Sequence, residues 1–354
     1  MSGSGEFGLP EVIAAALVLA LTAYAVTGGA DFGGGVWDLL ARGPRRDAQR
    51  RLIAHAIGPI WEANHVWLIL AVVILFTAFP AAFATLGVVL HIPLSLMLLG
   101  VVLRGSSFVF RTYGARDDAT QRRWSRVFAS ASIVTPLLLG IIVGALSSGA
   151  VGQADALLAA RAAAREAVPF AAVFVWPWLA PFPLAMGVLA VAMFAYLAAV
   201  YLALAAPDDA LRDDFRGRAL GAALVVFLAA FGGLVLSSRQ APHVTRALMS
   251  GSALVLQVAI GIAATGAIWA LWTRRWQLAR IAAGVQVSLI LWGWVLVQYP
   301  FMIPPMHTIR GVAAPRITLL LLLGALVIGS VVLIPSLVYL YRTFDDANRS
   351  DGVE

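Results

Sequence analysis

Long apolar segments separated by short polar loops constrain this chain more than any other feature of its sequence. A helix needs about 20 apolar residues to cross the hydrocarbon core of a bilayer, and these segments are about that long or longer. The mean hydropathy of +0.89 and the charged fraction of 12% exclude a soluble globular domain. We therefore predict an all-α, polytopic transmembrane bundle of about nine spans, placed near residues 10–39, 52–79, 83–103, 125–148, 174–205, 218–236, 248–272, 278–299 and 317–341.

The loops between these spans leave no room for a second domain, so residues 1–354 are predicted to form a single integral membrane domain. The loop at residues 207–214 carries charges of both signs, four aspartates and one arginine. It divides the chain into two blocks. The first block holds five spans, about residues 10–205, and the second holds four, about residues 218–342.

All 25 basic residues are arginines, and their distribution predicts the orientation of the chain. With the N-terminus outside, the inner loops hold nineteen arginines and the outer loops hold six. Cytoplasmic loops of helical membrane proteins carry such an excess, so we expect the N-terminus outside and the C-terminus in the cytoplasm. The arginines lie in short loops without interleaved aromatics that could stack on bases. Lipid headgroups are therefore their expected partners, and nucleic acid is not.

Metal and haem ligation are not expected of this chain. Cysteine is absent, which excludes disulfides, zinc held by cysteine, iron–sulfur clusters and thiolate ligation of haem. Only His or Met could ligate a metal. On one continuous helix, His55 and His65 would lie about 15 Å apart, too far to ligate one ion together.

Acids inside apolar spans are informative, because each costs on the order of 3 kcal/mol at bilayer depth unless it faces protein or water. In the first span, Asp31 and Asp38 lie seven residues apart, on one helical stripe that we predict to face the protein interior. Small residues let membrane helices approach closely. The glycines near Asp31 are therefore predicted to form a helix contact: Gly29, Gly33, Gly34 and Gly35.

In the second span, His55, Glu62 and His65 follow each other at spacings of seven and three residues, nearly on one stripe. Asp31 and Glu62 each lie about nine or ten residues from the inner ends of their antiparallel helices, a depth of about 14 to 15 Å. We therefore expect the two carboxylates at the same level in the membrane.

His91, on the third span, is predicted to lie slightly deeper. Together these groups form a graded row, from Asp38 near the cytoplasm through Asp31 and Glu62 to His65 or His91 near the midplane. Buried ionisable groups of this kind suit a proton relay, because burial moves their pKa values. The alternative is a buried hydrogen-bonded pair that only fixes the packing of the helices.

Two motifs carry a family resemblance. The first, TGGADFGGG at residues 27–35, ends the first span, and the second is IGPIWEANHVWLI at residues 57–69. The second motif is highly specific, with Trp61, Asn64 and Trp67 around the acid. On these residues the chain resembles subunit II of the cytochrome bd ubiquinol oxidase family. The resemblance extends along the whole chain and is strongest in its first 110 residues.

The resemblance implies a heterodimer of the bacterial inner membrane that oxidises quinol and reduces oxygen to water, as a terminal oxidase of the respiratory chain. The larger subunit I would bind two b-type haems and one haem d. The smaller subunit II ligates no haem and is not catalytic alone. Protons would be drawn from the cytoplasm, which separates charge without proton pumping. Glu62 matches the family's acidic position, which is associated with a proton path. The resemblance leaves open whether the complex contains a bound structural quinone or lipid, and whether a small accessory subunit joins it.

Gly28 and Ala30 stand where the family commonly has an acid and an aromatic residue, which is typical of a divergent branch. Two other functions are compatible with the buried acids. In a proton-coupled secondary transporter, they would bind substrate or ion at broken helices. In a purely structural membrane subunit, they would only hold the helices together.

Overall fold

The protein is described from a computed structural model, which covers residues 8–57, 61–113 and 118–350. Over these ranges the fold is helical apart from one short β-hairpin. Its elements are α1 (Leu9–Leu39), α2 (Arg46–Ile57), α3 (Trp61–Ala78), α4 (Pro80–Val89), α5 (His91–Tyr113), α6 (Asp118–Ser147), α7 (Ala150–Ala164), α8 (Phe170–Phe174), α9 (Pro181–Ala205), α10 (Asp209–Gln240), α11 (Pro242–Leu248), α12 (Gly251–Trp272), α13 (Trp276–Gln298), β1 (Phe301–Ile303), β2 (His307–Thr308) and α14 (Arg316–Ser350).

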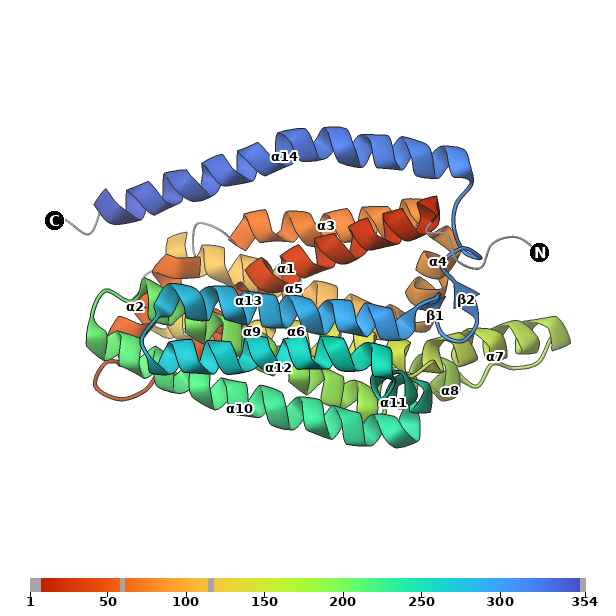
Figure 1. The fold of residues 1–354 in the computed structure, drawn as a ribbon, viewed down its shortest axis with the longest axis horizontal. Coiled ribbons are helices and arrows are strands. Elements are labelled where there is room, and N and C mark those ends of the chain that lie inside the picture. The colour runs from red at the N-terminus through yellow and green to blue at the C-terminus, as the bar shows by residue number, and fades with distance from the viewer. Residues whose placement is uncertain (1–7, 58–60, 114–117, 351–354) are drawn as a thin grey trace.

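The long helices run side by side along one axis (Figure 1), and α1 begins and α14 ends at opposite ends of the molecule. In the described part of the chain, eight helices are long and apolar enough to cross a membrane. The bent pair α3 and α4 supplies a ninth candidate. This confirms the predicted all-helical membrane bundle with about nine spans.

Helix α9 forms the centre of the bundle. Every residue from Ala192 to Val200 is buried, as expected for a helix that is apolar on all sides. It packs against α1, α6, α10 and α13. The indole Nε1 of Trp37 on α1 donates a buried hydrogen bond of 2.7 Å to the carbonyl oxygen of Ala195. The main core therefore joins helices from both predicted blocks around one central helix.

Glycines bring α1 against its neighbours. A Cβ atom on Gly29 would lie 2.6 Å from the ring of Phe194, and one on Gly33 would clash with the backbone carbonyl of Phe194 on α9. A Cβ atom on Gly35 would clash with the side chain of Ser132 on α6. Gly34 is buried and lines a cavity instead. Three of the four glycines thus lie at close helix contacts.

A second core closes the end of the bundle where α1 begins. It contains four fully buried side chains: Ile13 of α1, Ile74 of α3, Phe79 between α3 and α4, and Ile303 of β1 in the hairpin. The hairpin pairs β1 and β2 in antiparallel fashion. The guanidinium of Arg310, just after the hairpin, donates to the carboxylate of Glu11 in the first turn of α1. This ion pair ties the hairpin to α1.

Several predicted span boundaries were wrong, and two of the misplaced spans border the candidate site. The second predicted span, residues 52–79, is divided between α2 and α3, which end and begin on either side of Gly58-Pro59-Ile60, three residues outside the described ranges. The third, residues 83–103, is displaced, because α4 bends by 114° from α3 and the spanning helix α5 begins only at His91. Pro80 explains the bend: a proline lacks an N–H donor and is tolerated in the first turn of a helix but not inside it.

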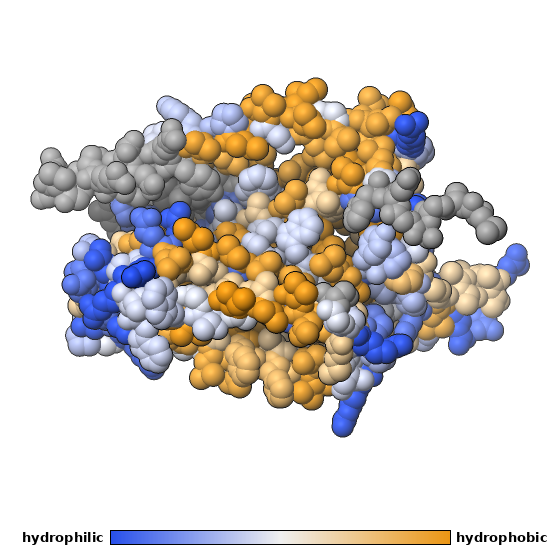
Figure 2. All heavy atoms as spheres, in the orientation of Figure 1, coloured by the Kyte–Doolittle hydropathy of each residue, from blue (hydrophilic) through white to orange (hydrophobic). Residues whose placement is uncertain are grey.

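Figure 2 shows one face of the molecule, with apolar side chains in a broad band across its middle and hydrophilic residues gathered toward both ends. Large exposed apolar side chains recur on several long helices, among them Leu228, Phe231, Val255 and Ile262. In water such a surface would be unfavourable. In a bilayer it is the lipid-facing surface of a multi-pass protein.

We predict that Gly33→Ala destabilises the protein by about 3 kcal/mol, the upper end of the usual cost of overpacking, because the added methyl group meets backbone that cannot rotate away. The matched control is Gly217→Ala on α10, where a Cβ atom meets nothing within 4 Å. The midpoint of thermal unfolding in detergent compares the two variants. Equal stability of Gly33→Ala and the wild type would contradict the close contact between α1 and α9.

Candidate functional site

Asp31 is the central acid of the candidate site. It lies within α1, it is buried, and its side chain is 5% exposed. The amide Nδ2 of Asn64 on α3 donates a hydrogen bond of 2.8 Å to the Oδ2 atom of Asp31. This bond brings the start of α3 to the level of Asp31.

A buried arginine faces the same region. Arg104 on α5 is 2% exposed, and its guanidinium interacts electrostatically with Asp31 and Tyr24. Its Nε atom donates to the hydroxyl of Ser132 on α6 at 3.2 Å, and its Cζ atom lies 4.7 Å from the ring centroid of Phe32. The Nη2 atom has no hydrogen-bond partner among the described residues. A positive charge, an acid and an open donor thus share one buried site.

Asp38 forms a second charged group, two turns along α1 toward the arginine-rich end. It is also 2% exposed, although it lies near the end of its helix. Arg111 places its Nη1 atom 3.3 Å from Oδ2, and Arg50 places its Nε atom 3.6 Å from Oδ1. Asp38 and Asp31 lie about 10 Å apart along the helix axis. That distance is too long for direct proton transfer, so a proton would need water in the gap to pass between them.

The remaining predicted residues of the second motif take different positions. His65 is half-buried, and its ring lies edge-on to Tyr24 with 6.2 Å between the centroids. Trp67 packs against the core around α9. Trp61 and Glu62 begin α3, but their side chains lie outside the described part of the structure.

His91 does not join this group. It is exposed at the first residue of α5, its Nδ1 atom lies 2.9 Å from the carbonyl oxygen of Val88, and its ring meets Phe174 of α8. Along α5 it lies about 20 Å from Arg104. The predicted position near the midplane was therefore wrong, because the span begins at His91 and not eight residues earlier.

Sequence reasoning missed Arg104 and Arg111 as site residues, because both were assigned to a cytoplasmic loop. In the structure both lie within α5, which continues to Tyr113. The apolar residues Phe108, Val109 and Phe110, which follow Arg104, were the available signal that the helix extends past the arginine.

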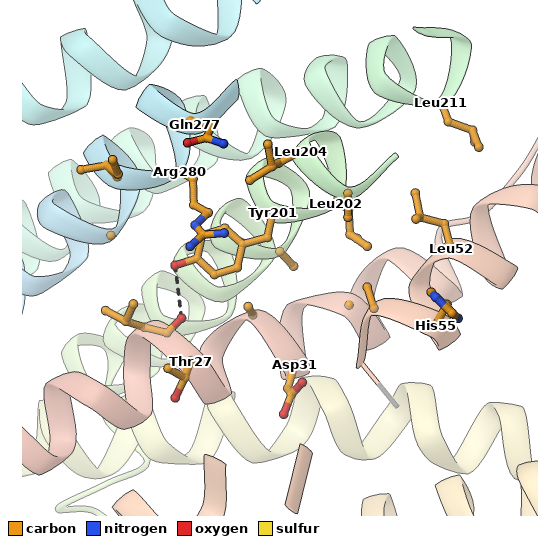
Figure 3. Close-up of a pocket in the computed structure, with 18 of the residues that line it drawn as sticks. Thr27, Asp31, Leu52, His55, Tyr201, Leu202, Leu204, Leu211, Gln277 and Arg280 are labelled. Atoms are coloured by element: carbon orange, nitrogen blue, oxygen red, sulfur yellow. Dashed lines mark hydrogen bonds between the residues drawn. The ribbon is translucent and has the colours of Figure 1, made fainter. Parts of the chain in front are cut away.

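A large cavity reaches this site. It has a volume of about 1910 Å³ and lies between α1, α2, α9 and α13. At the arginine-rich end it is lined by Arg51, Asp208 and Arg280, and within the bundle by Asp31 and Asn64. Figure 3 shows Asp31 and Thr27 on one wall and Arg280 on the opposite wall. The cavity therefore joins the level of Asp31 to the arginine-rich end of the bundle.

A buried carboxylate and an opposing positive charge thus lie beside the cavity. No group of three or more His, Asp or Glu side chains that could hold a metal ion occurs among the residues that the structure describes. Buried carboxylates beside a cavity can instead exchange protons with water, and Arg104 supplies a charge that opposes that of Asp31.

Comparisons with known proteins identify the family of this chain. The family model "Cytochrome bd terminal oxidase subunit II" matches residues 9–344. The "Putative cytochrome bd menaquinol oxidase subunit II" of Bacillus subtilis (strain 168) is 23% identical over 333 residues, 91% of each chain. The "Cytochrome bd ubiquinol oxidase subunit 2" of the same strain is 34% identical over 110 residues, which are 31% of this chain and 32% of that relative.

The "Cytochrome bd-I ubiquinol oxidase subunit 2" of Escherichia coli (strain K12) is 30% identical over 138 residues, which are 39% of this chain and 36% of that relative. The matches to the two ubiquinol oxidase subunits thus span about a third of those relatives' length. A chain in the solved structure of bd oxidase from Geobacillus thermodenitrificans shares the fold, with a TM-score of 0.77 at 22% identity over 95% of this chain and 98% of that chain.

The family model covers nearly the whole chain, and the structural likeness is equally extensive. This multi-pass membrane protein therefore belongs to the cytochrome bd terminal oxidase subunit II family.

Proposed function

We propose that this chain is the non-haem-ligating subunit II of a cytochrome bd-type quinol oxidase. In this proposal it scaffolds a haem-bearing subunit I, which would hold two b-type haems and one haem d. The complex would oxidise quinol and reduce oxygen to water in a bacterial inner membrane. Membership of the family supports this assignment, as do the relatives' names as ubiquinol and menaquinol oxidase subunits. The transporter alternative has no comparable support.

The chain would also conduct protons from the cytoplasm through Asp31 and Glu62. The observation that carries this second part is the buried Asp31, which accepts a hydrogen bond from Asn64 and lines a cavity that extends to the arginine-rich end. That end would face the cytoplasm by the positive-inside rule. Asp38 stands between this end and Asp31 on the same helix, so the two acids form successive positions for a proton.

Water would have to complete such a path. One water occupies roughly 30 Å³ in the liquid, so the cavity of about 1910 Å³ has ample room for a hydrated chain beside Asp31 and Asn64. Waters bridge buried polar groups at little cost when each has polar partners, and these two side chains offer such partners. The Nη2 atom of Arg104, which has no hydrogen-bond partner among the described residues, could donate to such a water.

Charge compensation explains how the acid is tolerated. A buried charge left without an opposite charge costs several kcal/mol, and arginine does not lose its proton in proteins. Arg104 and Asp31 therefore offset each other at a depth where neither would be stable alone. In this proposal Arg104 positions the acid and stabilises the site, and it does not itself carry the proton.

We predict that Asp31→Asn slows oxygen consumption by the assembled oxidase roughly a hundredfold, the low end of what a positioned acid–base group contributes. The amide keeps the shape and can still pair with Asn64, but it cannot take up a proton. Haem content and co-purification of subunit I should stay near wild type. Asp47→Asn on α2, an exposed acid, is the matched control. Wild-type turnover in a fully assembled Asp31→Asn oxidase would overturn the relay.

For Glu62, we predict that Glu62→Ala slows oxygen consumption while haem content stays near normal. Oxygen uptake with an artificial quinol, measured beside the haem spectrum, separates the two effects. Loss of haem would instead favour a role in packing or assembly. If Glu62→Gln left turnover intact in an assembled complex, the purely structural subunit would be the better description.

Removing Arg104 should destabilise the protein, because it leaves the buried Asp31 without an opposite charge. We expect Arg104→Leu to cost about 3–5 kcal/mol, with much of the loss recovered in the double variant Arg104→Leu/Asp31→Asn. The midpoints of thermal unfolding of the wild type, the two single variants and the double variant form the test. Additive effects of the two substitutions would show that the two charges do not interact.

A further inference from the structure

The mouth of the cavity carries two arginines that form no ion pair with any acid the structure describes. Arg51 on α2 and Arg280 on α13 both line it. Both side chains are exposed, and neither forms a hydrogen bond or ion pair with another described residue. Figure 3 shows Arg280 reaching from α13 toward the ring of Tyr201, with His55 on the far side of the cavity.

Two neighbouring arginines at this end of the bundle, Arg45 and Arg274, are paired with acids. Arg45 donates to Asp214 through its Nε atom at 2.8 Å, and Arg274 lies 3.0 Å from Asp213. The Asp214 carboxylate raises the pKa of the Arg45 guanidinium through this hydrogen bond. Arg51 and Arg280 have no such partners within residues 8–57, 61–113 and 118–350, so their positive charge is available to a ligand.

Asp208, the acid among the described residues that line the mouth, is already engaged. The Oδ1 atom of Asp208 accepts a hydrogen bond of 2.8 Å from the backbone N–H of Leu211 and so caps the start of α10. Asp31 lies deeper and is opposed by Arg104. Two arginines face one capping carboxylate, and the mouth carries a net positive charge.

Beyond the arginines the wall on the α13 side becomes apolar. Ile281, Val285 and Leu289 follow each other at four-residue spacings on one stripe of α13 and line the cavity, with Ser288 beside them. From Arg280 to Leu289 the helix rises about 13 Å. The cavity therefore offers a cationic mouth at headgroup level that leads into an apolar channel at the depth of acyl chains, which matches an amphiphile with an anionic head.

We infer that this cavity binds an anionic phospholipid, with its phosphate between Arg51 and Arg280 and an acyl chain along Ile281, Val285 and Leu289. Basic pockets between membrane helices on the cytoplasmic side recognise anionic headgroups by this chemistry. A free phosphate would leave the apolar channel empty, and a neutral headgroup would not use the two arginines. The inference does not depend on the proton path. The lipid would occupy the α13 side, whereas Asp31 and Asn64 line the α1 side.

The test uses the complete oxidase complex, purified in detergent and washed free of loosely bound lipid. The double variant Arg51→Gln/Arg280→Gln removes both charges. The matched control is Arg42→Gln/Arg46→Gln, which removes two exposed arginines at the same end that do not line the cavity. The haem spectrum and co-purification of subunit I establish assembly of each. Delipidated complex is then given phosphatidylglycerol or phosphatidylcholine with identical acyl chains, and bound lipid is counted by mass spectrometry.

We expect the wild type and the control to retain phosphatidylglycerol in preference to phosphatidylcholine. The double variant should bind phosphatidylglycerol roughly 30-fold more weakly, a factor of about five for each arginine. An excess of inorganic phosphate should not displace the lipid. The inference is overturned if the double variant binds phosphatidylglycerol as the wild type does, or if both lipids are retained equally. Displacement by phosphate alone, or retention of quinone in place of lipid, would overturn it as well. Turnover is not a readout, so failure here leaves the relay standing.

Discussion

The cost of placing charge within a bilayer organises this structure. Asp31, Asp38 and Arg104 lie in helices that cross the hydrocarbon region, where an unpaired charge is expensive. Each is almost completely buried in protein, and each has an oppositely charged group nearby. The four helices α1, α3, α5 and α6 meet around these groups, so the charged cluster and the packing of the first half of the bundle are mutually dependent.

Close helix packing makes that arrangement possible. Gly29 and Gly33 let α1 approach the backbone of α9, and Gly35 lets it approach α6. Since hydrocarbon tails are as apolar as most side chains, membrane helices gain little from apolar contact alone and depend on tight packing and interhelical hydrogen bonds. The bond from Trp37 to Ala195 is one of these, and it fixes α1 against the central helix on the side away from Asn64.

The cavity beside Asp31 makes this site different from the closed ion pair formed by Asp38. Asp38 and its two arginines form a compact charged group, whereas Asp31 has one hydrogen bond, one electrostatic partner and an open wall. A group that is buried yet reachable by water can change its protonation state. The same cavity offers a cationic mouth and an apolar wall, so water and lipid can use different sides of it.

Periodicity and hydropathy by themselves determined much of this protein. Span count, helical class and the inward orientation of Asp31 and Asp38 follow from local rules, because apolar length and helical spacing act within one segment. The placement of Arg104, the exposed position of His91 and the division between α2 and α3 did not follow. They depend on where a helix bends or continues. Pro80 permits the bend before α4, and α5 continues to Tyr113, but the neighbouring helices also determine both outcomes. Only the tertiary structure brought Asn64 and Arg104 to Asp31, placed Ser132 beside Arg104 and opened the cavity, because these groups come from four helices whose contacts no local pattern specifies.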